Sequence, residues 1–270
     1  LEGTYDFNVP VNVPVGSGSL TLRGNWDNNS TITQDGGTIY LGDVFTVADL
    51  GTFTGTSGLV SIFGTLDGVG TPTNETLTID STRQWQLDGG TLKDVTINGG
   101  GDILKPFQIT ASSGTLHNVT LGWNTTLRQG ASGTGNQVSV LNSLTLANNS
   151  LLRLERTSTT TGSNDTLDVG LNFTGTSSSL NGDGVVELFS VTGSGQEDDV
   201  RVRPIGGGTL TIGAGVTVRN STTSTLTTLG DAATGALVIA GKVSSQSSGQ
   251  TLRVTGASVT NTGTLESLAG

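Results

Sequence analysis

The chain has 270 residues, no cysteine and a formal net charge of −10, which excludes disulfides and thiolate zinc sites and makes nucleic acid or an anionic membrane an unsuitable partner. Aromatic residues make up 4% of the chain, and there are 42 glycines, so the side chains have too little bulk for a large globular core. Charged residues make up 13%, which is too few for a disordered chain. No apolar run reaches the roughly 18 residues of a membrane span, so we expect no membrane insertion by this segment.

Residues 1–18 differ from the rest of the chain. Valine recurs at every second position from Val9 to Val15, as in a strand, but Pro10 and Pro14 lack the N–H that a ladder needs and belong at an edge. We therefore expect residues 1–18 to form an N-terminal edge strand or a cap. No linker or shift in composition divides residues 19–270, which are predicted to form one domain.

The stretch from Gly64 to Leu146 repeats one short phrase. It reads Gly-Thr-Leu-Asp-Gly-Val, then Gly-Thr-Leu-Lys-Asp-Val-Thr-Ile, then Gly-Thr-Leu-His-Asn-Val-Thr-Leu, and finally Leu-Asn-Ser-Leu-Thr-Leu. The first leucine of each phrase is Leu66, Leu92, Leu116 and Leu141, so successive phrases lie about 24–26 residues apart. A near-constant period of this size is typical of stacked units, and the alternation of apolar residues with Thr indicates strands with one buried face.

About 24 residues without a helical pattern hold roughly three short strands and their turns, which can close one coil. Equivalent strands of successive coils would run parallel, about 4.8 Å apart. The sequence therefore predicts an all-β fold, a parallel β-helix (β-solenoid) with about 24–26 residues per coil. Its stability would come from the stacking of neighbouring coils, because one coil cannot bury its own apolar face.

Other segments show the same alternation, and breakers separate them. Strands are predicted at 19–22, 31–33, 37–47, 76–79, 102–109, 125–128, 150–154, 167–173, 185–191, 200–203, 208–212, 216–218, 236–239, 251–254 and 258–260. Loops are predicted at 70–74, 158–164 and 193–199.

The densest group of carboxylates is Glu197, Asp198 and Asp199. Carboxylate oxygens suit calcium, but consecutive residues of an extended chain point in alternate directions, and a solvated acidic turn is the simpler interpretation. The calcium-binding Gly-Gly-x-Gly-x-Asp repeat of β-rolls is not repeated in this chain. We assign no cofactor and keep these three residues as candidate calcium ligands.

One histidine and three tryptophans complete the candidate site residues. His117 occupies the position of Lys93 one coil earlier, which indicates an outer turn residue and not a catalytic base. Trp26, Trp85 and Trp123 are candidate glycan contacts, since an exposed indole offers a flat apolar face. They fall at different points of the period, which argues against an aligned sugar-binding ladder.

The repeated Gly-Thr-Leu-x-x-Val-Thr-Leu phrase and the sequence Ser-Val-Thr-Asn-Thr-Gly-Thr-Leu from Ser258 resemble the repeats of filamentous-haemagglutinin-like adhesins and autotransporter passenger domains, which are bacterial secreted β-helical surface proteins. The resemblance covers most of residues 19–266. It implies a right-handed parallel β-helix, extracellular or at the cell surface. This would be a non-enzymatic shaft or adhesin, a processed or excised segment of a larger protein. Its partners would be a host or cell-surface glycan or protein, or other copies of itself.

Two alternatives stay open. One is a self-assembling extracellular fibre subunit, in which the N-terminal strand or an open terminal coil docks on the next molecule. The other is a carbohydrate-active enzyme, since pectate lyases share the predicted fold. The chain lacks the Gly-His-Gly phrase of related hydrolases, and Arg201-Val-Arg-Pro204 lacks the spacing of the lyase motif. Asp80, Asp88, Asp94 and Asp102 lie at different phases of the coil.

Overall fold

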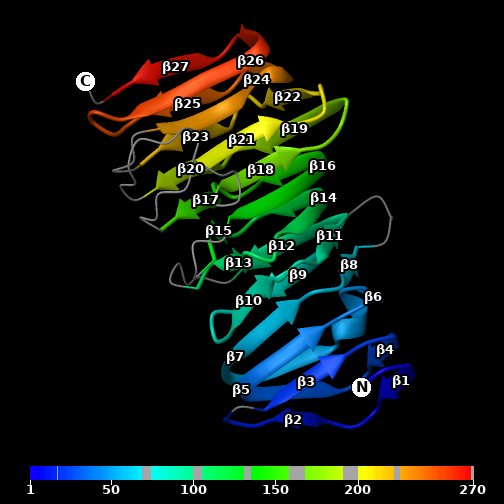
Figure 1. Cartoon of the computed structure of the whole chain (residues 1–270). Helices are drawn as coiled ribbons and strands as arrows, with labels where there is room; N and C mark the ends of the chain where they lie inside the picture. Colours follow the sequence, from blue (N-terminus) through cyan, green and yellow to red (C-terminus); the bar gives the residue numbers. More distant parts are fainter. Residues whose placement is uncertain are drawn as a thin grey trace.

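The structure, a computed structural model, describes residues 1–16, 18–68, 74–99, 105–130, 135–157, 168–190, 200–221 and 226–268. Within these ranges every strand pairing is parallel, and the 3₁₀ turn η1 (Ala48–Leu50) is the sole helical element. The prediction of an all-β fold with parallel sheets is therefore confirmed. The strands follow one another along the molecule, from β1 and β2 at one end to β26 and β27 at the other (Figure 1).

Two large sheets hold nearly all of the strands. The 12-stranded sheet consists of β2 (Val11–Val13), β3 (Ser19–Leu22), β5 (Thr31–Leu41), β7 (Thr52–Ile62), β10 (Gln84–Leu87), β13 (Phe107–Ile109), β15 (Thr125–Arg128), β17 (Leu151–Arg156), β20 (Val185–Ser190), β23 (Thr217–Asn220), β25 (Lys242–Ser245) and β27 (Thr264–Ser267). The 13-stranded sheet consists of β6 (Val44–Phe45), β8 (Thr65–Asp67), β9 (Glu75–Ile79), β11 (Thr91–Lys93), β12 (Val95–Gly99), β14 (Gly114–Leu121), β16 (Asn136–Leu146), β18 (Val169–Phe173), β19 (Ser177–Gly182), β21 (Val200–Pro204), β22 (Thr209–Ile212), β24 (Leu226–Ile239) and β26 (Thr251–Asn261). The strands β1 (Thr4–Phe7) and β4 (Asn25–Asn28) pair separately.

From β10 onwards the chain visits the two sheets alternately. After β10 it crosses to β11 and β12 in the 13-stranded sheet, then returns as β13, which pairs with β10 in parallel. We call each such passage through both sheets a rung. Two neighbouring parallel strands of one sheet need a long crossover connection between them, and here the segment that passes through the other sheet is this connection.

The length of a rung varies more than the sequence indicates. Within the regular run Thr65, Thr91, Thr115 and Ser139 pair in succession, so each rung there has the expected length. The pairing of Phe107 with Thr125 closes a shorter rung, whereas Arg153 and Glu187, also paired, are 34 residues apart. The predicted coil length therefore holds from β8 to β16 on the 13-stranded sheet and again between β23 and β25, where Thr217 pairs with Lys242, but it does not hold throughout the chain. The predicted loops at 70–74, 158–164 and 193–199 lie wholly or almost wholly outside the described residues.

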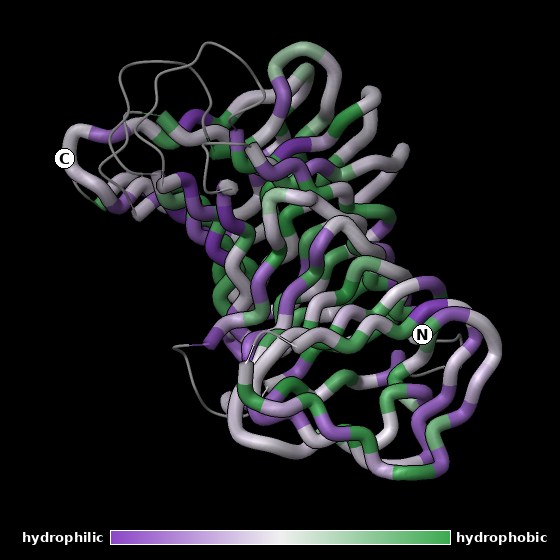
Figure 2. Tube along the Cα trace, turned by 60° about the horizontal axis from the view of Figure 1, so that its bottom comes forward, coloured by the Kyte–Doolittle hydropathy of each residue, from purple (hydrophilic) through white to green (hydrophobic). Residues whose placement is uncertain are grey.

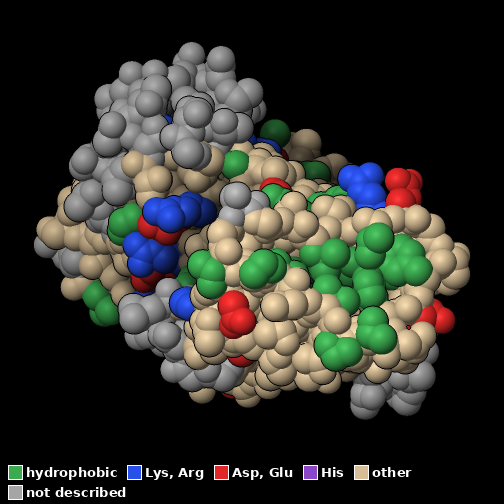
Figure 3. Space-filling model, turned by 90° about the horizontal axis from the view of Figure 1, so that it is seen from below, with side chains coloured by type: hydrophobic (Ala, Val, Ile, Leu, Met, Phe, Trp, Pro, Cys, Tyr) green, Lys and Arg blue, Asp and Glu red, His purple; other side chains and the backbone are tan. Residues whose placement is uncertain are grey.

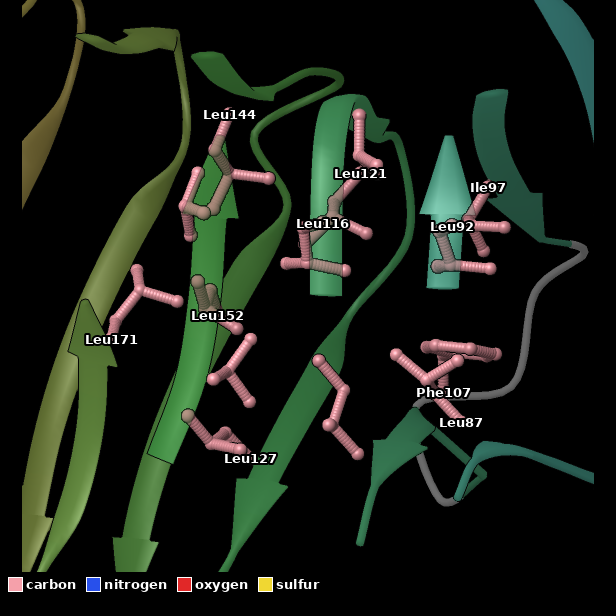
Figure 4. Packing of buried hydrophobic residues seen from close by; sticks show 14 of the residues in the cluster. Leu87, Leu92, Ile97, Phe107, Leu116, Leu121, Leu127, Leu144, Leu152 and Leu171 are labelled. Atoms are coloured by element: carbon pink, nitrogen blue, oxygen red, sulfur yellow. The ribbon is translucent and has the colours of Figure 1, made fainter. Parts of the chain in front are cut away.

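The core is a set of apolar columns, each made of one residue per rung. One column of the 12-stranded sheet pairs in register from β3 to β20, and every member is 0% exposed: Leu22, Leu41, Ile62, Leu87, Ile109, Leu127, Leu154 and Leu188. Figure 4 shows leucines of the two sheets facing one another across the interior, and Figure 2 shows apolar and polar residues alternating along the strands. Each buried leucine or isoleucine contributes about 1.5–3 kcal/mol, so a narrow core suffices.

The repeated phrase bends at its second variable position. Asp94, Asn118 and Asn142 occupy this bend with φ of 51°, 52° and 64°. Asn and Asp adopt this left-handed conformation more readily than other non-glycine residues. The Nδ2 of Asn118 also donates to Oδ1 of Asp94 in the preceding rung, at 2.8 Å. The polar residues at this position therefore have a structural explanation, in the backbone bend and in a contact between rungs.

Residues 1–18 contain β1 and β2. β1 pairs with β4, and β2 lies at the end of the 12-stranded path, where it pairs with β5. Pro10 and Pro14 flank β2, as expected for an edge position.

Candidate functional site

The acidic candidates Glu197, Asp198 and Asp199 lie outside the described residues, so their role as calcium ligands stays a prediction. In the parts of the chain that the structure describes, no group of three or more His, Cys, Asp or Glu side chains could hold a metal ion.

Trp26 and Trp85 lie in the core, which corrects the prediction that they offer an exposed face to a sugar. Both side chains are 3% exposed. The ring of Trp26 packs against Phe45 with centroids 5.3 Å apart, and that of Trp85 packs against Phe53 at 5.7 Å. Because both indoles are in inward strand positions, neither can stack on a ligand in this fold.

Trp123 is placed differently. It is half-buried and lies in the connection between β14 and β15, outside the strands. Its indole lies against the backbone of Gly99, one rung earlier, where an added Cβ would be 2.5 Å from Cδ2 of Trp123. Its Nε1 donates to the carbonyl oxygen of Lys105 at 3.5 Å, a long hydrogen bond. Only glycine at position 99 allows the indole to lie flat in this place.

Trp123 forms one wall of a cleft of about 350 Å³, which we call the Trp123 cleft. Its lining is uncharged and rich in carboxamides: Asn98, Gly99, Gly122, Trp123, Asn124, Asn148, Asn149 and Ser150. A tight turn presents two of these asparagines. Asn148 and Asn149 have φ of 59° and 55°, and the Ser150 N–H donates to the carbonyl of Ala147 at 3.0 Å, as in a type I′ turn.

The remaining carboxamides of the cleft are held by the backbone. Oδ1 of Asn98 accepts the Gly99 N–H at 3.0 Å, and Oδ1 of Asn124 accepts the Leu151 N–H at 2.9 Å. These bonds fix the orientation of both side chains and leave their NH₂ groups as donors. Sequence reasoning selected Trp123 but missed the asparagines, because they come from three successive rungs.

His117 pairs with Lys93 in the neighbouring rung, as the spacing predicts. Its Nε2 lies 3.0 Å from Nδ2 of Asn142. In the preceding rung Nζ of Lys93 is 2.8 Å from Oδ2 of Asp67, and this hydrogen bond raises the pKa of Lys93. Asp67, Lys93 and His117 pair in register and form a polar column on the 13-stranded sheet.

The aspartates considered for an enzyme have separate structural partners. Asp80 accepts hydrogen bonds from Thr82 and the Arg83 N–H, Asp88 accepts one from Thr110, and Asp94 accepts one from Asn118. Asp102 lies outside the described residues. Arg201 forms an ion pair with Asp168 at 2.8 Å, and the two side chains are 8% and 7% exposed.

Charged side chains also link neighbouring strands of the 12-stranded sheet. The Glu187 carboxylate, 6% exposed, lies between Arg153 at 3.1 Å and Arg219 at 3.0 Å, and so connects β17, β20 and β23. The Arg153 guanidinium also lies 3.9 Å from the centroid of the Phe189 ring, a cation–π contact. Sequence reasoning did not find this cluster, because its members come from three different rungs and lie far apart along the chain.

Within the described ranges no helix has the length and apolar character needed to cross a membrane. No protein-family model, curated protein or solved structure matches this chain.

Proposed function

We propose that the chain is a right-handed parallel β-helix that serves as a non-enzymatic, extracellular shaft or adhesive segment of a larger bacterial surface or secreted protein. The observation that supports this most strongly is an unbroken column of paired residues along the 12-stranded sheet. It runs through Thr21, Tyr40, Ser61, Gln86, Gln108, Thr126, Arg153, Glu187, Arg219, Ser244 and Glu266. Its ten steps of about 4.8 Å correspond to a stack about 48 Å long, a shape suited to holding two points apart.

The handedness follows from a general rule for parallel strands. Connections between parallel strands of one sheet are right-handed in about 98% of cases, because of the right-handed twist of the strands. Every pairing in the described part of the chain is parallel, so each rung is such a connection.

The use of the charged residues supports a structural role. Each of three ion pairs, Lys93–Asp67, Arg153–Glu187 and Lys242–Glu266, joins neighbouring strands of one sheet. These charges therefore have a structural use in joining the strands.

A panel of polysaccharides, scored for both retention and product release with and without calcium chelation, tests this proposal. We expect retention or no interaction, and no release of unsaturated or reducing sugars. Release would overturn the proposal in favour of a carbohydrate-active enzyme.

A fibre subunit is the second candidate function, supported by the two ends of the stack. Among the described residues the exposed large apolar side chains gather mainly at these ends: Leu1, Val9 and Val15 at one, and Val259, Leu265 and Leu268 at the other, with Tyr40 and Val44 elsewhere. Figure 3 views the molecule from the β1–β2 end and shows a group of hydrophobic side chains there. Because the ladders are parallel, the last rung of one copy could pair with the first rung of a second copy and continue both sheets.

Light scattering over a range of protein concentrations tests the fibre candidate. Growth of head-to-tail oligomers that the substitution Leu265→Glu abolishes would support it. A monomer at all concentrations would contradict it.

A further inference from the structure

We propose that the Trp123 cleft binds a neutral saccharide, a ligand with an apolar ring face on one side and hydroxyl groups around its rim. This inference rests on the proposed function, because it supplies the adhesive contact of a non-enzymatic shaft. It names the ligand class and the residues that bind it.

The aromatic wall of the cleft suits the apolar face of a sugar ring. Leu121 pairs with Ile97 and with Leu146, so positions 99, 123 and 148 have the same offset in three successive rungs. The indole therefore rests on Gly99 and has Asn148 at the corresponding place of the next rung. Its packing on Gly99 fixes the ring, so little side-chain entropy is lost when a ligand stacks on it.

The carboxamides of the cleft suit hydroxyl groups. The NH₂ groups of Asn98 and Asn124 have no protein partner among the described residues, while their oxygens are held by backbone N–H groups. The Nδ2 of Asn148 is 3.5 Å from the carbonyl of Gly122, which leaves its Oδ1 as an acceptor. Fixed carboxamides of this kind both donate to and accept from hydroxyl groups.

The charge and size of the cleft narrow the ligand class. None of the lining side chains is charged, so nothing in the cleft would compensate a phosphate, sulfate or carboxylate. Its volume of about 350 Å³ lies at the lower end of the about 300–1,000 Å³ typical of small-ligand sites. A short stretch of neutral saccharide meets both conditions.

Gly122 lines the cleft and offers a direct test. A Cβ at this position would lie 3.0 Å from Nδ2 of Asn148 and 3.4 Å from Oδ1 of Asn98, so an alanine would narrow the cleft. Gly213 provides a matched control. Gly213 follows Ile212, the last residue of β22, just as Gly122 follows Leu121, the last residue of β14. A Cβ added at Gly213 would lie 3.1 Å from Oδ1 of Asn181. No tryptophan is near Gly213 in the sequence.

The experiment uses the 270-residue chain, immobilised and probed with neutral oligosaccharides built from glucose, galactose, mannose or N-acetylglucosamine, with polygalacturonate as the acidic comparison. We expect at least one neutral oligosaccharide to be retained, with tryptophan fluorescence that shifts on binding, because Trp26 and Trp85 are buried. Trp123→Ala and Gly122→Ala should weaken this binding at least tenfold. Gly213→Ala should leave it unchanged. Urea denaturation shows whether each variant is folded.

Three outcomes would overturn the inference: retention that survives both Trp123→Ala and Gly122→Ala, retention of polygalacturonate alone, or no retention of any neutral probe. None of these contradicts the shaft. Product release from any probe would instead contradict the proposed function, so the two failures are distinguishable.

Discussion

Replacement of Leu92 by alanine tests whether the apolar columns stabilise the fold as the structure indicates. Leu92 is 0% exposed and pairs directly with Leu66 and Leu116. The change removes three buried carbons, worth about 0.8 kcal/mol each, and leaves a cavity between two rungs that cannot close without shifting both ladders. We expect Leu92→Ala to lower the free energy of unfolding by about 3–4 kcal/mol, within the range of about 2–5 kcal/mol for such changes.

Urea denaturation measures this loss, with Thr91→Ala as the control on the outward face of the same strand. The control should cost less than about 1 kcal/mol. Contact between stacked leucines also predicts energetic coupling. The effects of Leu92→Ala and Leu116→Ala on the free energy of unfolding should differ from their sum by about 0.5–3 kcal/mol in the double variant, whereas the effects of Leu92→Ala and the distant Leu210→Ala should add. A loss at Leu92 as small as that at Thr91, or equal additivity for both pairs, would refute the reasoning.

Three further predictions follow from the polar residues. Asn118→Ala should lower the melting temperature, by an amount equivalent to about 1–2 kcal/mol, because φ there is 52°, while Asn118→Gly should cost clearly less; equal losses would exclude a backbone cause. Glu187→Ala should cost about 1–3 kcal/mol in urea, since it leaves two partly exposed arginines beside a buried gap, whereas Lys93→Ala should have a clearly smaller effect because its ion pair is screened by solvent; the reverse order would contradict this. The hydrogen bond from Lys242 lowers the pKa of Glu266, so its stabilisation is present above the ordinary pKa of 4.5 and is lost as the pH falls below it. Glu266→Gln should therefore reduce the loss of stability between neutral and acid pH, and an unchanged acid profile would contradict the assignment.

The regular run was predictable because two independent signals agree there. The Gly-Thr-Leu phrase and the alternation of apolar residues both place Leu66, Leu92 and Leu116 in one column, and the structure pairs them in that register. The fourth copy was placed one residue too far along. Leu116 pairs with Val140, and Leu141 pairs with His117. After the bend, where β16 has one extra residue, Val119 pairs with Leu144, as the alignment of the phrases predicts. A bulge of one residue leaves no mark in the apolar spacing.

The tryptophans show where sequence reasoning fails and where it could have succeeded. Trp85 alternates with Leu87 between glutamines, which is a local signal for an inward position. The segment around Trp26 has polar neighbours on both sides, so its burial against Phe45 depends on tertiary packing. The Trp123 cleft could not be foreseen, because it depends on the exact stacking of three rungs. The consecutive asparagines at 148–149 are its one local signal, since asparagine tolerates the positive φ that both central positions of a type I′ turn require.

Pulsed electron–electron spin resonance between pairs of nitroxide labels tests most directly whether the rungs form one continuous shaft. The chain has no cysteine, so labels at Thr21→Cys, Thr126→Cys and Glu266→Cys are specific. These positions lie in one column, in which Thr126 is five strand-to-strand steps from Thr21 and Glu266 is ten steps from Thr21. We predict narrow distance distributions near about 24 Å for Thr21–Thr126 and about 48 Å for Thr21–Glu266, apart from the length of the label linkers. A Thr21–Glu266 distance no longer than the Thr21–Thr126 distance, or a broad distribution, would contradict a rigid stack.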